Sequence, residues 1–214
     1  MSTNRTDVRR LAQRGSNDRN AAYEILDTAM VAHVGIVDEG FPVVIPMLCA
    51  RDGDHVLLHG SSRSRLMRSL AEGCNACVTV TLIDSLVLAR SAFNHSANYR
   101  SLVVFGHARA LRKLEEKRAA LEKFVDHLVP GRSADARPGN AGELKATLIV
   151  AMPIDEFSVK ARRGPPEDKK TDMGLQVWAG EMPVFTKFGS PIPAPELPSD
   201  ADVPDYIKAM IPDR

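Results

Sequence analysis

Residues 56–73 read VLLHGSSRSRLMRSLAEG, and the rest of the chain can be placed around this stretch. The apolar residues up to His59 predict a short strand, and Gly60 with the two serines after it predicts a turn. A helix is expected over residues 62–72, because leucines recur at helical spacing and Gly73 is a helix-ending residue. The first N–H groups of a helix have no partner within it, so this order of elements predicts a site for an anion such as a phosphate.

The side chains of this turn suit an anion. Gly60 lets the backbone approach closely, serine hydroxyls donate hydrogen bonds, and arginine guanidinium groups bind phosphate oxygens in pairs. The alternative is structural, with one serine capping the helix and both arginines in solvent. The residues that carry these two interpretations are Ser61, Ser62, Arg63, Ser64 and Arg65.

Composition limits the class of protein. The 214 residues are 44% hydrophobic and 26% charged, which is typical of one globular domain with a full core. A net charge of +1 gives no support to nucleic-acid binding. The first 20 residues lack an apolar run, no stretch is long enough to span a membrane, and three cysteines fit a reducing compartment, so we expect a cytoplasmic protein.

Strands joined by short turns surround the opening stretch. Residues 31–38 and 42–49 predict strands before it, and Pro46 places the second of these at an edge or a bulge. Further strands are expected at 74–83, 86–92, 101–109, 147–152 and 156–162, with helices at 21–30, 113–128 and 143–147. Turns this short exclude parallel crossovers, so the pattern predicts a mainly antiparallel, closed or half-closed β-barrel with helices.

Composition divides the chain into three expected parts. Residues 1–20 are polar and form an arm, and residues 21–168 form the barrel domain. Residues 169–214 are rich in proline and form an extension that packs on the barrel or on a partner.

A second polar cluster, FNHSANYRS, occupies residues 93–101 between two apolar strands. It is either an ordinary loop or a binding segment. Binding is favoured by Tyr99, Arg100 and Ser101, which run directly into the next strand, where a structural sequence would place β-branched residues. The histidines lack metal-binding spacing. His59, and similarly His33 and His95, is either structural or able to contact a phosphate or a ring edge. The CxxC of Cys74 and Cys77 has no second pair, so we interpret it as two small apolar residues and expect no metal. No catalytic motif is found, so the catalytic residues are not assigned.

Several segments in one order resemble a known family. They are PVVIPML at 42–48, DGDHVLLHGSSRSRLMRSL at 52–70, CVTVTLIDSLVLARSAFNHSANYRSLVVFGHAR at 77–109 and KATLIVAMPIDEFSVKARRGPP at 145–166. Together they resemble the pyridoxamine 5′-phosphate oxidase-like FMN-binding split-barrel proteins, in the branch that includes the nitroimidazole-resistance proteins. The resemblance implies a six-stranded antiparallel split β-barrel and a homodimer with FMN at the interface.

The resemblance also implies roles for residues. Ser61, Ser62, Ser64 and Arg65 would hold the phosphate, and the strand at 44–47 would offer backbone groups to the flavin ring. The segment at 99–101 would come from the partner chain, and a C-terminal tryptophan would cover the flavin. The complete cofactor-binding set is Val44, Ile45, Pro46, Met47, His59, Gly60, Ser61, Ser62, Ser64, Arg65, Leu66, Tyr99, Arg100, Ser101 and Trp178.

Two departures argue against pyridoxamine phosphate oxidation. The oxidases carry SRKG in the phosphate turn where this chain has SRLM at 64–67, and their C-terminal Arg-x-His is absent. We therefore expect an FMN-binding oxidoreductase of an unidentified small substrate. The alternatives are a nitro-group reductase, a flavin or haem carrier or sensor, and a barrel without ligand. Haem would need a histidine such as His59, His33 or His95, and spacing selects none of them.

Overall fold

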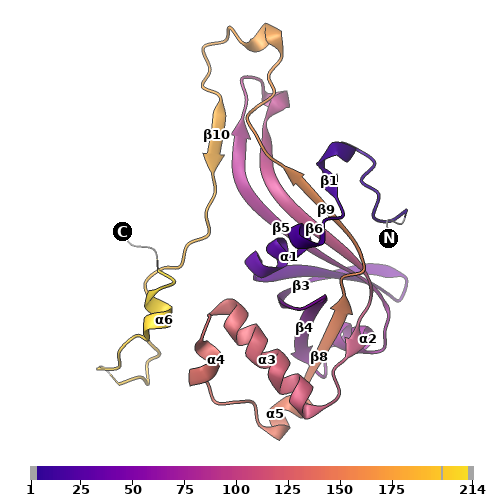
Figure 1. Cartoon of the computed structure of the whole chain (residues 1–214), viewed down its shortest axis with the longest axis vertical. Coiled ribbons are helices and arrows are strands. Elements are labelled where there is room, and N and C mark those ends of the chain that lie inside the picture. The colour runs from indigo at the N-terminus through magenta and orange to yellow at the C-terminus, as the bar shows by residue number, and fades with distance from the viewer. Residues whose placement is uncertain (1–3, 199, 212–214) are drawn as a thin grey trace.

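A ten-stranded antiparallel sheet forms the body of the molecule in the computed structural model, which describes residues 4–198 and 200–211 (Figure 1). The strand order is β1-β9-β6-β5-β2-β3-β4-β8-β7, with β10 beside β5. The strands are β1 (Gly15–Ser16), β2 (Val31–Asp38), β3 (Phe41–Asp52), β4 (His55–Ser61), β5 (Asn75–Leu88), β6 (Ser96–His107), β7 (Arg109–Ala110), β8 (Thr147–Pro153), β9 (Glu156–Arg162) and β10 (Gly180–Pro183). The predicted antiparallel class is confirmed. The strand count of six is too low, and in the described part of the chain the order runs from β1 to β7 without closing.

Helices cover this sheet where the sequence has apolar residues at helical spacing. The α-helices of the described residues are α1 (Arg19–Thr28), α2 (Arg65–Ala71), α3 (Leu114–Leu128), α4 (Arg132–Asp135), α5 (Ala141–Ala146) and α6 (Asp205–Lys208). Helix α1 begins where the Asp18 side chain accepts a hydrogen bond from the Asn20 N–H at 3.0 Å, as expected of a capping residue. Within this part of the chain, every helix falls short of the length and apolarity that a membrane crossing requires.

Two apolar clusters make the core. The larger one lies on the inner face of the sheet, where Val34, Val78 and Val104 meet α1 and α2. In the smaller one, Phe124 of α3 packs on Leu57 of β4 and on neighbouring residues of β8. The first cluster therefore fixes α2 and the turn before it, while the second fixes the opposite side of β4.

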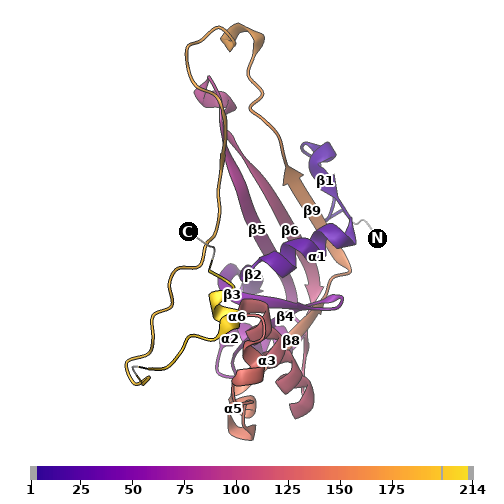
Figure 2. The same cartoon turned by 60° about the vertical axis from the view of Figure 1, so that its left-hand side comes forward.

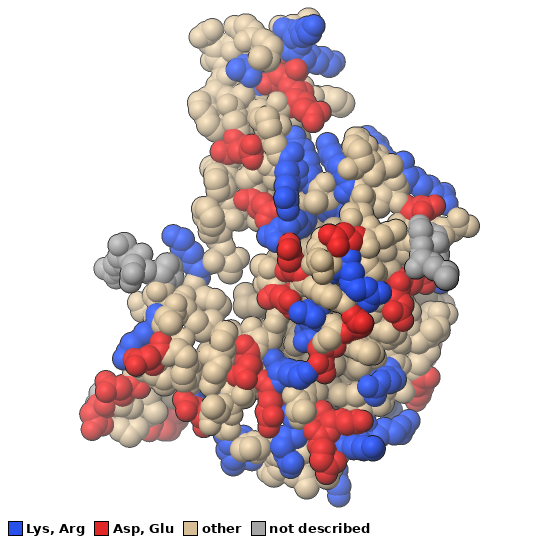
Figure 3. All heavy atoms as spheres, in the orientation of Figure 1, with Lys and Arg blue, Asp and Glu red and all other residues tan. Residues whose placement is uncertain are grey.

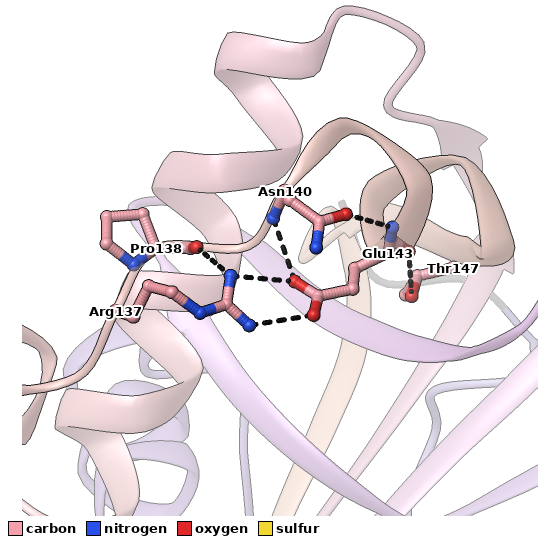
Figure 4. Close-up of polar contacts among 5 residues, drawn as sticks. All are labelled: Arg137, Pro138, Asn140, Glu143 and Thr147. Carbon is pink, nitrogen blue, oxygen red and sulfur yellow. Dashed lines mark hydrogen bonds and ion pairs between the residues drawn. The ribbon is translucent and has the colours of Figure 1, made fainter.

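Helix α5 begins with a capping box (Figure 4). The Glu143 N–H donates to the Asn140 side chain at 3.0 Å, and the Glu143 carboxylate accepts from the Asn140 N–H at 2.8 Å. Arg137 holds the same carboxylate, which lowers the pKa of Glu143. The helix ends where β8 begins, so the box sets the entry of β8 beside β4.

The β5–β6 hairpin is longer than the sequence predicted, and it projects away from the helices (Figures 1 and 2). The sequence predicted one strand before residues 84–85 and another after them. Instead β5 is continuous, and its pairing with β6 shifts register at this point. A bulge accommodates the extra residue, and the Asp84 carboxylate accepts a hydrogen bond from Arg100 of β6 at 2.8 Å. Of the polar cluster at 93–101, the residues from Ser96 onward therefore belong to β6.

The chain after β9 returns along the hairpin and then leaves it. Strand β10 pairs with residues 85–88 of β5, and the following segment descends to α6, where Tyr206 contacts Arg132 and Asp135 beside α3 (Figure 2). The descending segment carries exposed apolar side chains. They are Val184, Phe185, Phe188, Ile192 and Leu197.

Buried polar groups fasten this returning chain to the hairpin. Asn98 of β6 donates to Ser85 at 2.9 Å and accepts from Arg162 of β9. Next to this network, the Asp168 side chain is 2% exposed and accepts from Arg90 at 2.9 Å. Burial opposes ionisation of Asp168, but the hydrogen bonds from Arg90 outweigh it and lower its pKa below the ordinary 3.8.

We predict that Asp168→Asn lowers the unfolding temperature by a few degrees at pH 7, because it removes the charge that pairs with Arg90. A lowered pKa contributes stability that is present above pH 3.8 and is lost as the pH falls through the shifted value. In thermal melts the difference from wild type should therefore stay constant from pH 7 to about pH 5 and shrink as the pH falls below 3.8. Asp155→Asn, at an exposed carboxylate, is the matched control. A difference that stays constant with pH would contradict this account.

Candidate functional site

The predicted phosphate turn lies between β4 and α2, and the helix begins later than expected. Its first residue is Arg65 and not Ser62, because Ser64 is the capping residue, with its Oγ accepting from the Met67 N–H at 3.4 Å. Ser61 organises the turn before it, since its Oγ accepts from the Arg63 N–H at 3.2 Å. Each of these hydroxyls can still donate its own proton to an anion.

Arg65 already has a carboxylate partner. Its Nε lies 2.9 Å from Asp38 at the end of β2, and its side chain is 65% exposed. A phosphate at this turn would therefore share or displace Asp38. Arg63 is exposed at the same turn.

Two residues of the predicted cofactor set have structural roles. Leu66 is 3% exposed and belongs to the core, so its side chain is not available to a ligand. A Cβ at Gly60 would come within 2.9 Å of the Met67 side chain and 3.8 Å of Met47. Gly60 is thus needed for α2 to pack on β4. Met47 of β3 lies close to Gly60 in space, so β3 is next to the turn.

Strand β3 offers an open edge beside this turn. It pairs with β2 from residue 41 to residue 48 but with β4 only from residue 49 to residue 52. Val44 is 61% exposed, and Ile45 and Pro46 are exposed as well. This agrees with the prediction that Pro46 marks an edge. Among the described residues, no strand pairs with the other side of the 44–47 segment.

The predicted segment at 99–101 lies far along the sheet, on β6. Its side chains alternate, so Tyr99 and Ser101 share the outer face while Arg100 points to the inner face. Arg100 is paired with Asp84, and the Ser101 hydroxyl donates to the Lys160 carbonyl at 3.1 Å. The three residues therefore do not act as one cluster within this chain.

Trp178 belongs with the hairpin and not with the turn. It is 67% exposed and precedes β10, and its ring lies 2.9 Å from the position of a Cβ at Gly180. The predicted cofactor set thus falls into two groups, one at the turn and β3 and one at β6 and β10. Strands β5 and β2 lie between them in the sheet, so one chain does not bring the two groups together.

The histidines have different surroundings. His59 packs against Phe124 with ring centroids 4.4 Å apart, its buried Nδ1 has no hydrogen-bond partner in the described structure, and burial lowers its pKa. His33 is exposed on β2, and His95 donates from Nδ1 to the Ser91 carbonyl at 2.9 Å. His107, which the sequence did not single out, donates from Nδ1 to the Gly73 carbonyl at 2.9 Å.

The cysteines are separate thiols. Burial raises the pKa of Cys49 to about 11, which keeps it protonated. Cys74 packs against the core, whereas Cys77 lies on the outer face of β5 beside Thr79. Across the described residues, no group of His, Cys, Asp and Glu side chains could hold a metal ion by itself.

A cavity of about 370 Å³ opens on the outer face of the sheet. Gly35, Val44, Cys77, Phe105 and His107 are among its lining residues. Sequence reasoning missed it because these residues belong to four strands. The one signal available was Gly35, a glycine inside a strand.

Comparison with known proteins identifies relatives of this chain. Residues 18–161 match the family model for pyridoxamine 5′-phosphate oxidase. The flavocytochrome Anf3 from Azotobacter vinelandii is 38% identical over 97% of each chain, with a TM-score of 0.90. The FAD and haem binding protein from Mycobacterium smegmatis is 37% identical over 92% of this chain and 97% of its own, with a TM-score of 0.89.

A third structure supports the fold alone. It is a proposed 5-nitroimidazole antibiotic resistance protein from Bacteroides thetaiotaomicron, 24% identical over 68% of this chain and 85% of its own, with a TM-score of 0.58. None of the curated proteins compared with this sequence matches it. The family model and the two more similar structures agree with the resemblance found in the sequence. The chain belongs to the pyridoxamine 5′-phosphate oxidase family.

Proposed function

We propose that this protein is a flavin- and haem-binding redox protein that works as a homodimer. The observation that carries the proposal is the similarity, over more than nine tenths of this chain, to a flavocytochrome and to an FAD and haem binding protein. The sequence resemblance led us to expect FMN, whereas the second of these neighbours binds FAD. We therefore favour FAD, with FMN as the alternative that the experiment distinguishes.

The turn between β4 and α2 supports the flavin part of the proposal. It combines serine hydroxyls, the N–H groups at a helix start and the Arg65 guanidinium next to the open edge of β3. The backbone of that edge can bind the ring, as peptide groups without a strand partner need other partners.

The two separated groups of predicted residues support the homodimer. The hairpin and the descending segment extend from the body (Figure 1). The descending segment leaves large apolar side chains such as Phe185 and Ile192 exposed, and exposed apolar side chains of this kind suit a partner surface. A second copy can place Tyr99 and Trp178 of its own hairpin over the turn of the first. Charges of both signs are interspersed over the face in Figure 3, so this face carries no single-sign field that would repel a second copy.

The chain contributes position and electrostatics to the chemistry. A bound flavin supplies hydride or electron transfer, and the residues described above bind and orient it. Arg65 fixes the phosphate, and a covering aromatic such as Trp178 excludes water from the ring. We propose an oxidoreductase or electron carrier, and a nitroreductase activity has only the fold likeness in its favour.

We predict that the purified full-length protein carries a flavin and binds haem. Its visible spectrum should contain flavin absorption and a Soret band, and acid release should yield FAD. Release of FMN would restore the original cofactor expectation. A protein without flavin after supply of both nucleotides would contradict the proposal. NADH or NADPH oxidation by the loaded protein would separate an enzyme from a carrier.

We predict that Arg65→Ala weakens flavin binding about 10-fold, because a charge-assisted hydrogen bond is worth about 1.5–3 kcal/mol and this side chain is largely exposed to screening water. Fluorescence titration with FAD measures the effect, and Arg63→Ala is the matched control. Asp38→Asn should have the opposite effect and tighten binding, because it removes the carboxylate that competes with the phosphate. Equal affinities for wild type and Arg65→Ala would show that the phosphate lies elsewhere.

A further inference from the structure

The cavity on the outer face is formed by two neighbouring cross-strand rows. In the first row, Glu156, Phe105, Cys77, Gly35 and Val44 lie side by side on β9, β6, β5, β2 and β3. In the second row, His107 faces Asn75, and Val37 faces Pro42. Their outward positions line one hollow of about 370 Å³ on the face of the sheet opposite the core.

Gly35 creates the depth of this hollow, and the fold does not require glycine there. Its backbone is ordinary strand backbone, outside the group of glycines with positive φ. A Cβ at this position would meet the Cys77 carbonyl and the Val44 side chain at 3.7 Å, which is normal packing distance. Glycine inside a strand costs stability, and where the backbone does not need it, it marks close approach by another group.

The walls of the hollow suit a flat apolar group. Val44 and Phe105 stand on either side of the Gly35 and Cys77 positions, and Val37 and Pro42 continue the apolar surface. The Arg5–Glu156 ion pair, 2.8 Å long, lies at the polar margin. A planar macrocycle with polar substituents at one edge matches this distribution.

His107 stands at this hollow in the state that a metal ligand requires. Its Nδ1 donates to the Gly73 carbonyl at 2.9 Å, so in the neutral imidazole the proton lies on Nδ1 and Nε2 has the lone pair that a metal needs. His59 differs, since the nitrogen it leaves without a partner is buried against α3, and His95 is at the hairpin tip. His33 is exposed on the same face of β2 but does not line the hollow.

We propose that the hollow over Gly35 is the haem site and that His107 would bind the iron through Nε2. This inference rests on the haem binding proposed above and assigns it to residues of this chain. Gly35, Val44 and Phe105 would supply the apolar surface against which the macrocycle packs. The carbonyl of Gly73 keeps the imidazole oriented, and because Gly73 ends the segment after α2, it links the haem site to the helix whose start forms the phosphate turn.

The test is a titration of full-length apoprotein with haemin, followed by its Soret band and by the electron paramagnetic resonance spectrum of the iron. We expect His107→Ala to bind at least about 10-fold more weakly, with a changed axial-ligand spectrum that added imidazole restores. Gly35→Val should also bind more weakly while retaining the wild-type melting temperature, because a β-branched residue suits a strand. His33→Ala, on the same face but outside the hollow, is the matched control and should bind as wild type does.

The outcomes separate the two levels of the proposal. Wild-type protein without a Soret band would overturn the haem part of the proposed function and this inference with it. Wild-type binding with unchanged His107→Ala and Gly35→Val variants would overturn this inference alone, and loss of binding in His59→Ala would then place the ligand at His59. A Gly35→Val protein that keeps its haem but no longer forms a dimer would show that the hollow receives the partner chain.

Discussion

Strand β3 changes partner in its middle, and the other features of the molecule depend on this change. Its first part pairs with β2 and its last part with β4, so the sheet divides and leaves one edge of residues 41–48 open. Backbone groups at such an edge need partners, and an edge left bare is a hazard for aggregation. The turn before α2 stands beside the opening because Gly60 allows Met67 and Met47 to meet. Packing at Gly60, the Ser64 cap and the Arg65–Asp38 ion pair therefore place an open edge, a helix start and a cation together.

The two faces of the sheet differ in what they can bind. The inner face carries the core and holds α1 and α2, while the outer face has a glycine where a side chain would fit without strain. Helix α2 touches both regions, since the turn precedes it and Gly73, whose carbonyl binds His107, follows it. A flavin at one end and a haem beyond the other would be connected by two turns of helix.

The sequence predicted elements well where the signal is local and poorly where distant residues provide it. The turn and the strand at 156–162 follow from neighbouring residues, whereas the helix after the turn was expected from residue 62 and begins only after its cap, Ser64. The hairpin was predicted too short because Asn98 and Asp84 look like loop residues, yet Arg162 and Arg100 satisfy them inside the sheet. The hollow was missed because Gly35, Cys77 and Phe105 meet only through strand register. Leu66 was assigned to the cofactor by its place in a motif, although its apolar side chain belongs to the core.

The central claim is that the flavin site is shared between two chains, and mixed dimers test it directly. One chain carries Arg65→Glu in the turn, the other carries Tyr99→Ala with Trp178→Ala in the hairpin group, and different affinity tags isolate the mixed dimer. Each variant dimer alone should lack flavin. If the site is shared, the mixed dimer contains one intact pairing of turn and hairpin and should bind about one flavin per dimer. A mixed dimer that binds no flavin, while the wild-type dimer binds two, would mean that each chain completes its own site and would contradict this account.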